Sequence, residues 1–95
     1  MANGERARLS VKVSGMVQGV GFRWHTHRAA EKLRLSGWVR NLRDGSVEIQ
    51  AEGDRATLEQ FLEWVRRGPA FSRVENVSVT WGPAQNEDVG FFIKH

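Results

Sequence analysis

The sequence contains no cysteine, and none of its apolar runs is long. Without a thiol the chain forms no disulfide, offers no thiolate metal ligand and has no cysteine nucleophile. No run approaches the roughly 20 apolar residues that span a bilayer, and residues 1–6 lack the apolar core of a signal peptide. We therefore expect a cytoplasmic protein with no membrane partner.

A block of like charge is also missing. The formal net charge is +3, and the eleven arginines and three lysines are scattered along the chain instead of gathered in one segment. A small basic excess permits an anionic partner without requiring one. The scatter indicates solvated surface groups, so we expect no nucleic-acid partner.

The 95 residues suffice for one domain, spanning 1–95, with a single modest hydrophobic core. Residues 1–6 are polar, and we expect them to fray. Because the pattern shows no obvious extra apolar surface, a monomer is expected.

Alternation of apolar and polar residues predicts half-buried strands. The segments with this alternation are 9–13, 47–51 and 77–81. Asp44-Gly45 predicts a tight turn, which makes 38–42 and 47–51 the arms of a hairpin. The segment 91–93 could add a short closing strand.

Apolar residues at helical spacing predict two helices. The first runs from Phe22 to about Leu35, and the second follows Asp54, an expected N-cap, and ends at Gly68. The resulting order favours an α+β ferredoxin-like β-α-β-β-α-β two-layer sandwich, an antiparallel sheet with both helices on one face. Many unrelated activities use this fold, so it does not decide the function.

The stretch Gly15-Met16-Val17-Gln18-Gly19-Val20-Gly21-Phe22-Arg23 joins the first strand to the first helix. Free N–H groups at a helix N-terminus attract anions, glycines let the backbone approach a ligand, and a guanidinium matches phosphate oxygens. The stretch indicates a phosphate cradle, although a glycine turn without ligand is the commoner meaning of such spacing. It matches neither the dinucleotide-binding nor the Walker pattern.

A second motif, Gly37-Trp38-Val39-Arg40-Asn41, is followed by Gly45-Ser46-Val47 and Gly53. Together the two motifs make the chain, from about residue 8 to 94, resemble the acylphosphatase family. The resemblance implies hydrolysis of the carboxyl–phosphate bond of acyl phosphates, giving a carboxylate and inorganic phosphate. It implies no metal and no other cofactor.

The resemblance also implies roles for individual residues. Arg23 would bind the substrate phosphate, and Asn41 would orient the attacking water. The phosphate oxygens would be held by main-chain amides of Val17, Gln18, Gly19, Val20, Gly21 and Phe22. The loop side chains are expected to matter less, except that Gly19 and Gly21 keep the cradle open.

The chemistry agrees with a site that lacks acids and bases. Phosphoryl transfer depends mainly on positioning and on stabilising charge at the phosphoryl oxygens. The leaving carboxylate, whose conjugate acid has a pKa of about 4, departs without a protonating residue. Inorganic phosphate is then expected as product and inhibitor.

Two other functions remain as alternatives. A domain of this shape could bind phosphate or carbamoyl phosphate without turnover, like the similar domain of a hydrogenase-maturation carbamoyltransferase. An RNA-binding module would require aromatic residues on the central strands beside basic ones, and the segment 47–50 does not provide them.

His25 and His27 lie two residues apart on the expected helix, so they point in different directions and cannot chelate one metal ion together.

Overall fold

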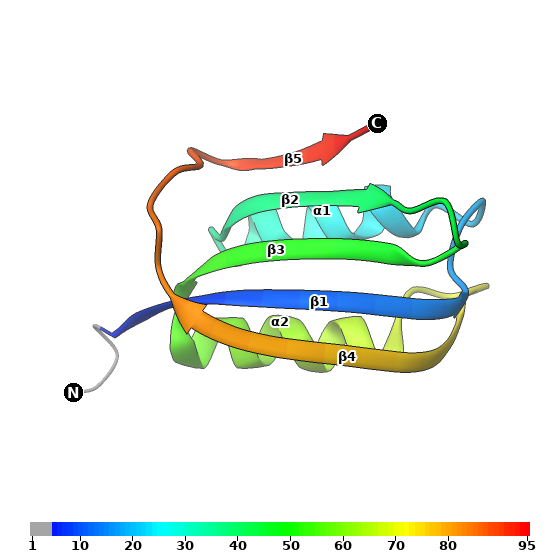
Figure 1. Ribbon diagram of the computed structural model, residues 1–95, viewed down its shortest axis with the longest axis horizontal. Helices are drawn as coiled ribbons and strands as arrows, with labels where there is room; N and C mark the ends of the chain where they lie inside the picture. The colour runs from blue at the N-terminus through cyan, green and yellow to red at the C-terminus, as the bar shows by residue number, and fades with distance from the viewer. Residues whose placement is uncertain (1–4) are drawn as a thin grey trace.

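The computed structural model describes residues 5–95, which form one sheet with two helices packed on one of its faces (Figure 1). The elements in chain order are β1 (Arg6–Met16), α1 (Phe22–Lys32), β2 (Ser36–Asn41), β3 (Val47–Asp54), α2 (Arg55–Arg67), β4 (Arg73–Pro83) and β5 (Phe91–Lys94). Within residues 5–95, neither helix combines the length and the apolar character needed to cross a bilayer.

The N-terminal segment differs from the expectation of a frayed lead-in. Residues 1–4 of the predicted segment 1–6 lie outside the described residues. Arg6 already begins β1 and is paired with Asp54 of β3. The ladder therefore orders the chain earlier than its polar composition indicates.

The sheet order is β4-β1-β3-β2-β5. The first four strands pair antiparallel, which confirms the predicted ferredoxin-like arrangement. The closing strand β5 also exists, but it pairs parallel to β2, so the whole sheet is mixed. The reason is the connection after β4, which crosses from one edge of the sheet to the other before β5 begins (Figure 1).

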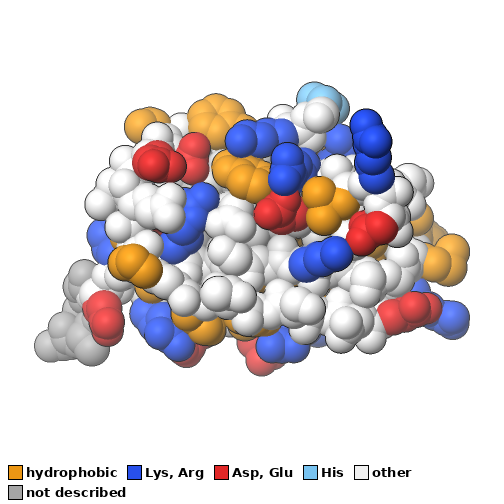
Figure 2. All heavy atoms as spheres, in the orientation of Figure 1, with side chains coloured by type: hydrophobic (Ala, Val, Ile, Leu, Met, Phe, Trp, Pro, Cys, Tyr) orange, Lys and Arg blue, Asp and Glu red, His pale blue; other side chains and the backbone are white. Residues whose placement is uncertain are grey.

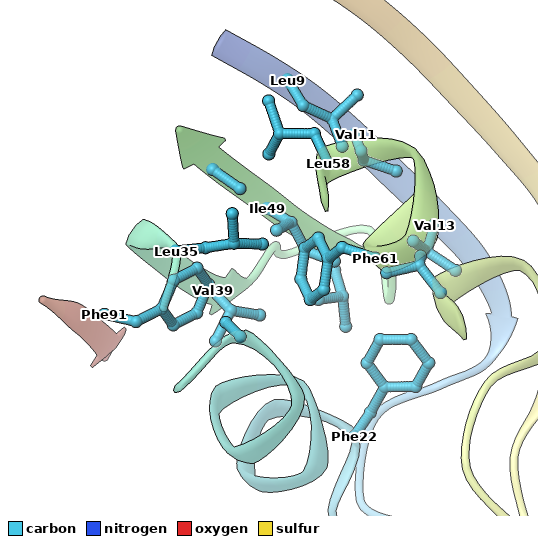
Figure 3. Packing of buried hydrophobic residues seen from close by; sticks show 14 of the residues in the cluster. Leu9, Val11, Val13, Phe22, Leu35, Val39, Ile49, Leu58, Phe61 and Phe91 are labelled. Carbon is cyan, nitrogen blue, oxygen red and sulfur yellow. The ribbon is translucent and has the colours of Figure 1, made fainter. Parts of the chain in front are cut away.

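The hydrophobic core lies between the sheet and the helices, and the predicted alternation supplies it. Figure 3 shows side chains from both layers meeting there. Fully buried core residues include Leu9, Val13, Ile49, Val39, Leu58, Phe61 and Val65. Each large apolar side chain buried in this way contributes about 1.5–3 kcal/mol before the entropy of ordering is counted.

Phe22, the first residue of α1, is only 1% exposed and lies 6.2 Å from the Trp64 ring of α2, centroid to centroid. This packing fixes the start of α1 against the core (Figure 3). Thr26 and Ala30 continue the buried stripe as predicted. The residue after Phe22 is thereby held at a defined place on the rim of the core.

The predicted end of α1, near Leu35, is about three residues too late. The helix stops at Lys32, because Arg34 adopts a left-handed conformation with φ 59° and turns the chain. Leu35, predicted as the last helical residue, is instead buried just before β2. Tertiary burial of Leu35 thus overrides the helical spacing.

The second helix follows the prediction more closely. Asp54 occupies the N-cap position and Gly68 the C-cap position, and Leu58, Phe61 and Val65 are buried. The Asp54 side chain, however, makes no capping hydrogen bond. The Arg55 N–H instead donates to the carbonyl of Glu5 at 3.1 Å.

The face of the sheet opposite the helices carries charges of both signs side by side (Figure 2). Arg40 contacts Glu48 at 2.7 Å, and Lys12 contacts Asp44 at 3.0 Å. Exposed pairs of this kind contribute little to stability. They do interrupt any continuous basic surface on this face of residues 5–95.

Glu52 joins this face to the long connection between β4 and β5. Its side chain is 2% exposed and accepts hydrogen bonds from Arg8 Nη1 (2.7 Å) and from the backbone N–H groups of Gln85 (2.6 Å) and Asn86 (2.9 Å). Burial alone would raise the pKa of Glu52, but these donors outweigh it and hold the pKa below the ordinary 4.5. The ionised carboxylate therefore fixes the path that brings β5 to the far edge.

We predict that Glu52→Gln lowers the free energy of unfolding by about 2 kcal/mol at pH 7, because hydrogen bonds to a buried charge are lost. Because the pKa of Glu52 is lower in the folded protein than the ordinary value of 4.5, the ionised carboxylate stabilises the fold fully at pH values above about 4.5. This stabilisation disappears as the pH falls through the folded-state pKa. Denaturant unfolding at several pH values should therefore show a steeper acid loss in the original chain than in Glu52→Gln.

The matched control is Glu48→Gln, which removes the more exposed pair with Arg40. It should cost less than about 1 kcal/mol. Equal pH dependence in the original chain and in Glu52→Gln would contradict this account of Glu52.

Candidate functional site

A cleft of about 220 Å³ lies at the N-terminal end of α1, beside the last residue of β2. The structure brings both sequence motifs to it. Its lining consists of Val17, Gly19, Gly21, Phe22, Arg23, Trp24, Asn41, Ile93 and His95. Six of the eight predicted site residues therefore meet in one cleft, and Gln18 and Val20 are the two that do not line it.

The glycine loop reaches the cleft through two left-handed residues. Gly19 has φ 78° and Gly21 has φ 77°, a region that other residues rarely adopt. Gly21 is the N-cap of α1, where no side chain caps the helix and no acidic residue lies in the first turn. The N–H groups of that turn and the positive end of the helix dipole are therefore not neutralised locally.

Arg23 lies in this first turn, directly after the buried Phe22. Its Nη1 is 3.4 Å from Nδ1 of His95, which follows β5. Among residues 5–95 it forms no ion pair with a carboxylate. Since a guanidinium carries five N–H donors, most of its hydrogen-bonding capacity is left for an anion in the cleft.

Asn41 is the last residue of β2, and the ladder with Val47 of β3 fixes its position. Its Oδ1 is buried and has no hydrogen-bond partner among residues 5–95. A buried acceptor left without a donor costs about 1–3 kcal/mol. Asn41 lines the cleft, and its Oδ1 receives no hydrogen bond from residues 5–95.

The side chain of Gln18 makes a contact that the sequence analysis missed. Its Nε2 donates to the carbonyl oxygens of Leu42 and Ser46, both at 2.8 Å. These carbonyls belong to the hairpin turn that follows Asn41, so the amide ties the glycine loop to the other half of the cleft. A usable signal existed, because Gln18 is the only polar side chain between Gly15 and Phe22.

The hairpin turn itself is well braced, as Asp44-Gly45 predicts. Leu42 donates to the carbonyl of Ser46 at 2.8 Å, and Gly45, with φ 93°, donates to Leu42 at 3.2 Å. The Asp44 carboxylate accepts from the hydroxyl and the N–H of Ser46 and lies beside Lys12. These hydrogen bonds hold the pKa of Asp44 far below its ordinary value.

The two histidines of α1 contact different residues. His27 contacts Glu31 at 3.4 Å, and the His25 ring meets the Trp24 ring edge-on. Within residues 5–95 no group of three or more His, Cys, Asp or Glu side chains is placed to hold a metal ion.

Comparison with known proteins gives one consistent result. The family model for acylphosphatases matches residues 9–93. A protein named acylphosphatase from Salinibacter ruber is 46% identical over 94 residues, covering 99% of each chain. The crystal structure of an acylphosphatase from Bacillus subtilis superposes with a TM-score of 0.90 at 42% identity, covering 94% of this chain and 99% of that one. The structure of full-length HypF gives a TM-score of 0.84 at 26% identity, but only 12% of its length is covered, against 96% of this chain.

The Gln18 contact generates a prediction about stability. Gln18→Met keeps the length of the side chain and removes both hydrogen bonds to the hairpin. We expect the free energy of unfolding to fall by about 1–3 kcal/mol, and amide hydrogen exchange to accelerate in the turn around Leu42.

Gln60→Met, at an exposed position of α2, is the matched control and should change stability by less than about 0.5 kcal/mol. If the two variants were equally stable, and their amide hydrogens in the turn exchanged at equal rates, then the hydrogen bonds from Gln18 to the hairpin would not stabilise the protein.

Proposed function

The chain belongs to the acylphosphatase family, and from that membership we propose which residues of its cleft hold the phosphate and which residue holds the attacking water during hydrolysis of acyl phosphates. The enzyme cleaves the bond between a carboxyl group and a phosphate, releasing a carboxylate and inorganic phosphate. In the proposal, Arg23 and the glycine loop hold the phosphate, and Asn41 holds the water. The supporting observation is that all three line one cleft, where Asn41 Oδ1 has no partner among residues 5–95.

The phosphate half combines a cation with converging N–H donors. Arg23 supplies the guanidinium, and the amides from Val17 to Phe22 (through Gln18, Gly19, Val20 and Gly21) supply the donors. Support comes from the uncapped N-terminus of α1, with no acidic residue in its first turn. Charge that builds up on the phosphoryl oxygens in the transition state is stabilised by such donors when they are held in place beforehand.

The water half depends on the Asn41 amide. A neutral amide cannot take a proton, but its Oδ1 can accept a hydrogen bond from a water molecule and so fix the direction of attack. Holding a reactant in position lowers the barrier without acid–base chemistry. We infer that an oxygen of the substrate phosphate accepts the proton of this water.

The departing group requires no acid. A carboxylate is a weak base, with a conjugate acid of pKa about 4, and leaves as an anion. Consistently, no Asp or Glu side chain is among the described residues that line the cleft. The same cleft would serve a phosphate monoester poorly, because an alkoxide leaves only with a proton.

The proposal extends to the product and to partners. Inorganic phosphate keeps the charge and shape of the bound group, so it should compete with the substrate.

The mixed charges on the open sheet face do not favour the RNA-binding alternative. We also propose that the enzyme acts as a monomer, because one chain by itself already brings Arg23, the glycine loop and Asn41 together, so no second copy is needed to complete the site.

The decisive test is release of phosphate from benzoyl phosphate in the presence of a metal chelator. We expect activity to survive chelation and to be inhibited competitively by inorganic phosphate. In Arg23→Ala, kcat/KM should fall by about a hundredfold or more, because a charged donor at the phosphoryl oxygens is lost.

Arg66→Ala removes an arginine from the last turn of α2, outside the cleft, and should leave kcat/KM within about twofold. Phosphate binding without turnover in the folded protein would favour a non-catalytic binding domain. Full activity in Arg23→Ala would overturn the assignment of the phosphate half.

A further inference from the structure

Part of the cleft lining has no role in holding the phosphate or the water. Besides the glycine loop, Arg23 and Asn41, the cleft is lined by Trp24, Ile93 and His95. Val17 and Phe22 are almost completely buried and can form only its floor. Whatever extends from a bound phosphate toward solvent therefore meets these three side chains.

Trp24 is the largest of the three and is 51% exposed. It follows Arg23 in the first turn of α1, and both residues line the same cleft. Large aromatic side chains are usually covered in a folded protein, and a half-exposed one at the mouth of a cleft is a natural contact for a ligand.

The Trp24 ring is also held in place. The His25 ring meets it edge-on at 4.9 Å and 81°, and the Arg28 guanidinium lies 5.0 Å from its centroid. Since Arg28 covers one face of the indole, a group in the cleft would contact the remaining face or edge. Because the Trp24 side chain is already ordered before a ligand binds, it loses little conformational entropy on binding.

His95 and Ile93 reach the same cleft from the end of the chain, on and just after β5. His95 lies 3.4 Å from Arg23 through Nδ1 and Nη1, so it borders the phosphate half directly. Ile93 pairs with Val39 in the ladder and packs against the core. The mouth of the cleft thus offers two flat rings and an aliphatic side chain, and no carboxylate among the described lining residues.

We propose that Trp24 is a specificity-determining residue for the acyl group, an inference that rests on the proposed function. Its indole contacts the acyl part of the substrate and favours flat, unsaturated acyl groups over small saturated ones. Contact between aromatic groups adds to the gain from burying their area. A methyl group next to the carbonyl is too small to gain this contact.

The test compares kcat/KM for benzoyl phosphate and acetyl phosphate in the original enzyme and in Trp24→Leu. We expect benzoyl phosphate to lose about three- to tenfold, the size that an aromatic contact implies, and acetyl phosphate to change less than about twofold. Trp24→Phe should keep most of the preference. The ratio of the two kcat/KM values is independent of how much of each preparation is folded.

Phe92→Leu is the matched control, because Phe92 is also 51% exposed but does not line the cleft. It should leave the ratio unchanged. If kcat/KM fell by the same factor for both substrates in Trp24→Leu, or did not change for either, the ratio would stay the same and the acyl subsite would be overturned. That result would leave the phosphate assignment intact as long as kcat/KM for both substrates still falls about a hundredfold or more in Arg23→Ala, so the two proposals fail separately.

Discussion

The two hydrogen bonds from the Gln18 side chain to the β2–β3 turn are the constraint on which the cleft depends. The glycine loop leaves β1, whereas Asn41 ends β2, and β3 lies between these strands in the sheet. Without a direct link, a flexible glycine loop and a hairpin end would move independently. One amide that donates to both Leu42 and Ser46 sets their separation, and a displacement of about 1 Å is enough to cost a hundredfold in rate.

Several polar groups at this cleft are left without partners. Gly21 caps α1 without a side-chain hydrogen bond, and Asn41 Oδ1 is buried without a partner among residues 5–95. Over the same residues Arg23 has no carboxylate partner. An uncapped helix start and a buried acceptor without a donor each lower stability. Such features are expected to occur together where a ligand supplies the missing partners.

Much of this could be predicted from the sequence, because periodicity encodes which face of each element is buried. The alternation of Leu9 and Val11 and the stripe of Leu58 and Phe61 placed the core correctly. The parallel pairing of β5 and the early end of α1 could not be predicted, since both depend on contacts between distant segments. The same holds for the cleft. The two motifs named its residues, but the Gln18 contact and the positions of Trp24 and His95 appear only in three dimensions.

The central claim is that the cleft has two separable halves, one for the phosphate and one for the water. It is tested most directly by measuring kcat and the inhibition constant of inorganic phosphate in Asn41→Ala, with Asn76→Ala on the exposed side of β4 as the control. The account predicts that kcat falls about a hundredfold in Asn41→Ala, while the inhibition constant stays within about threefold and the control matches the original enzyme. A folded Asn41→Ala variant with full turnover, or one that loses phosphate affinity in step with turnover, would contradict it.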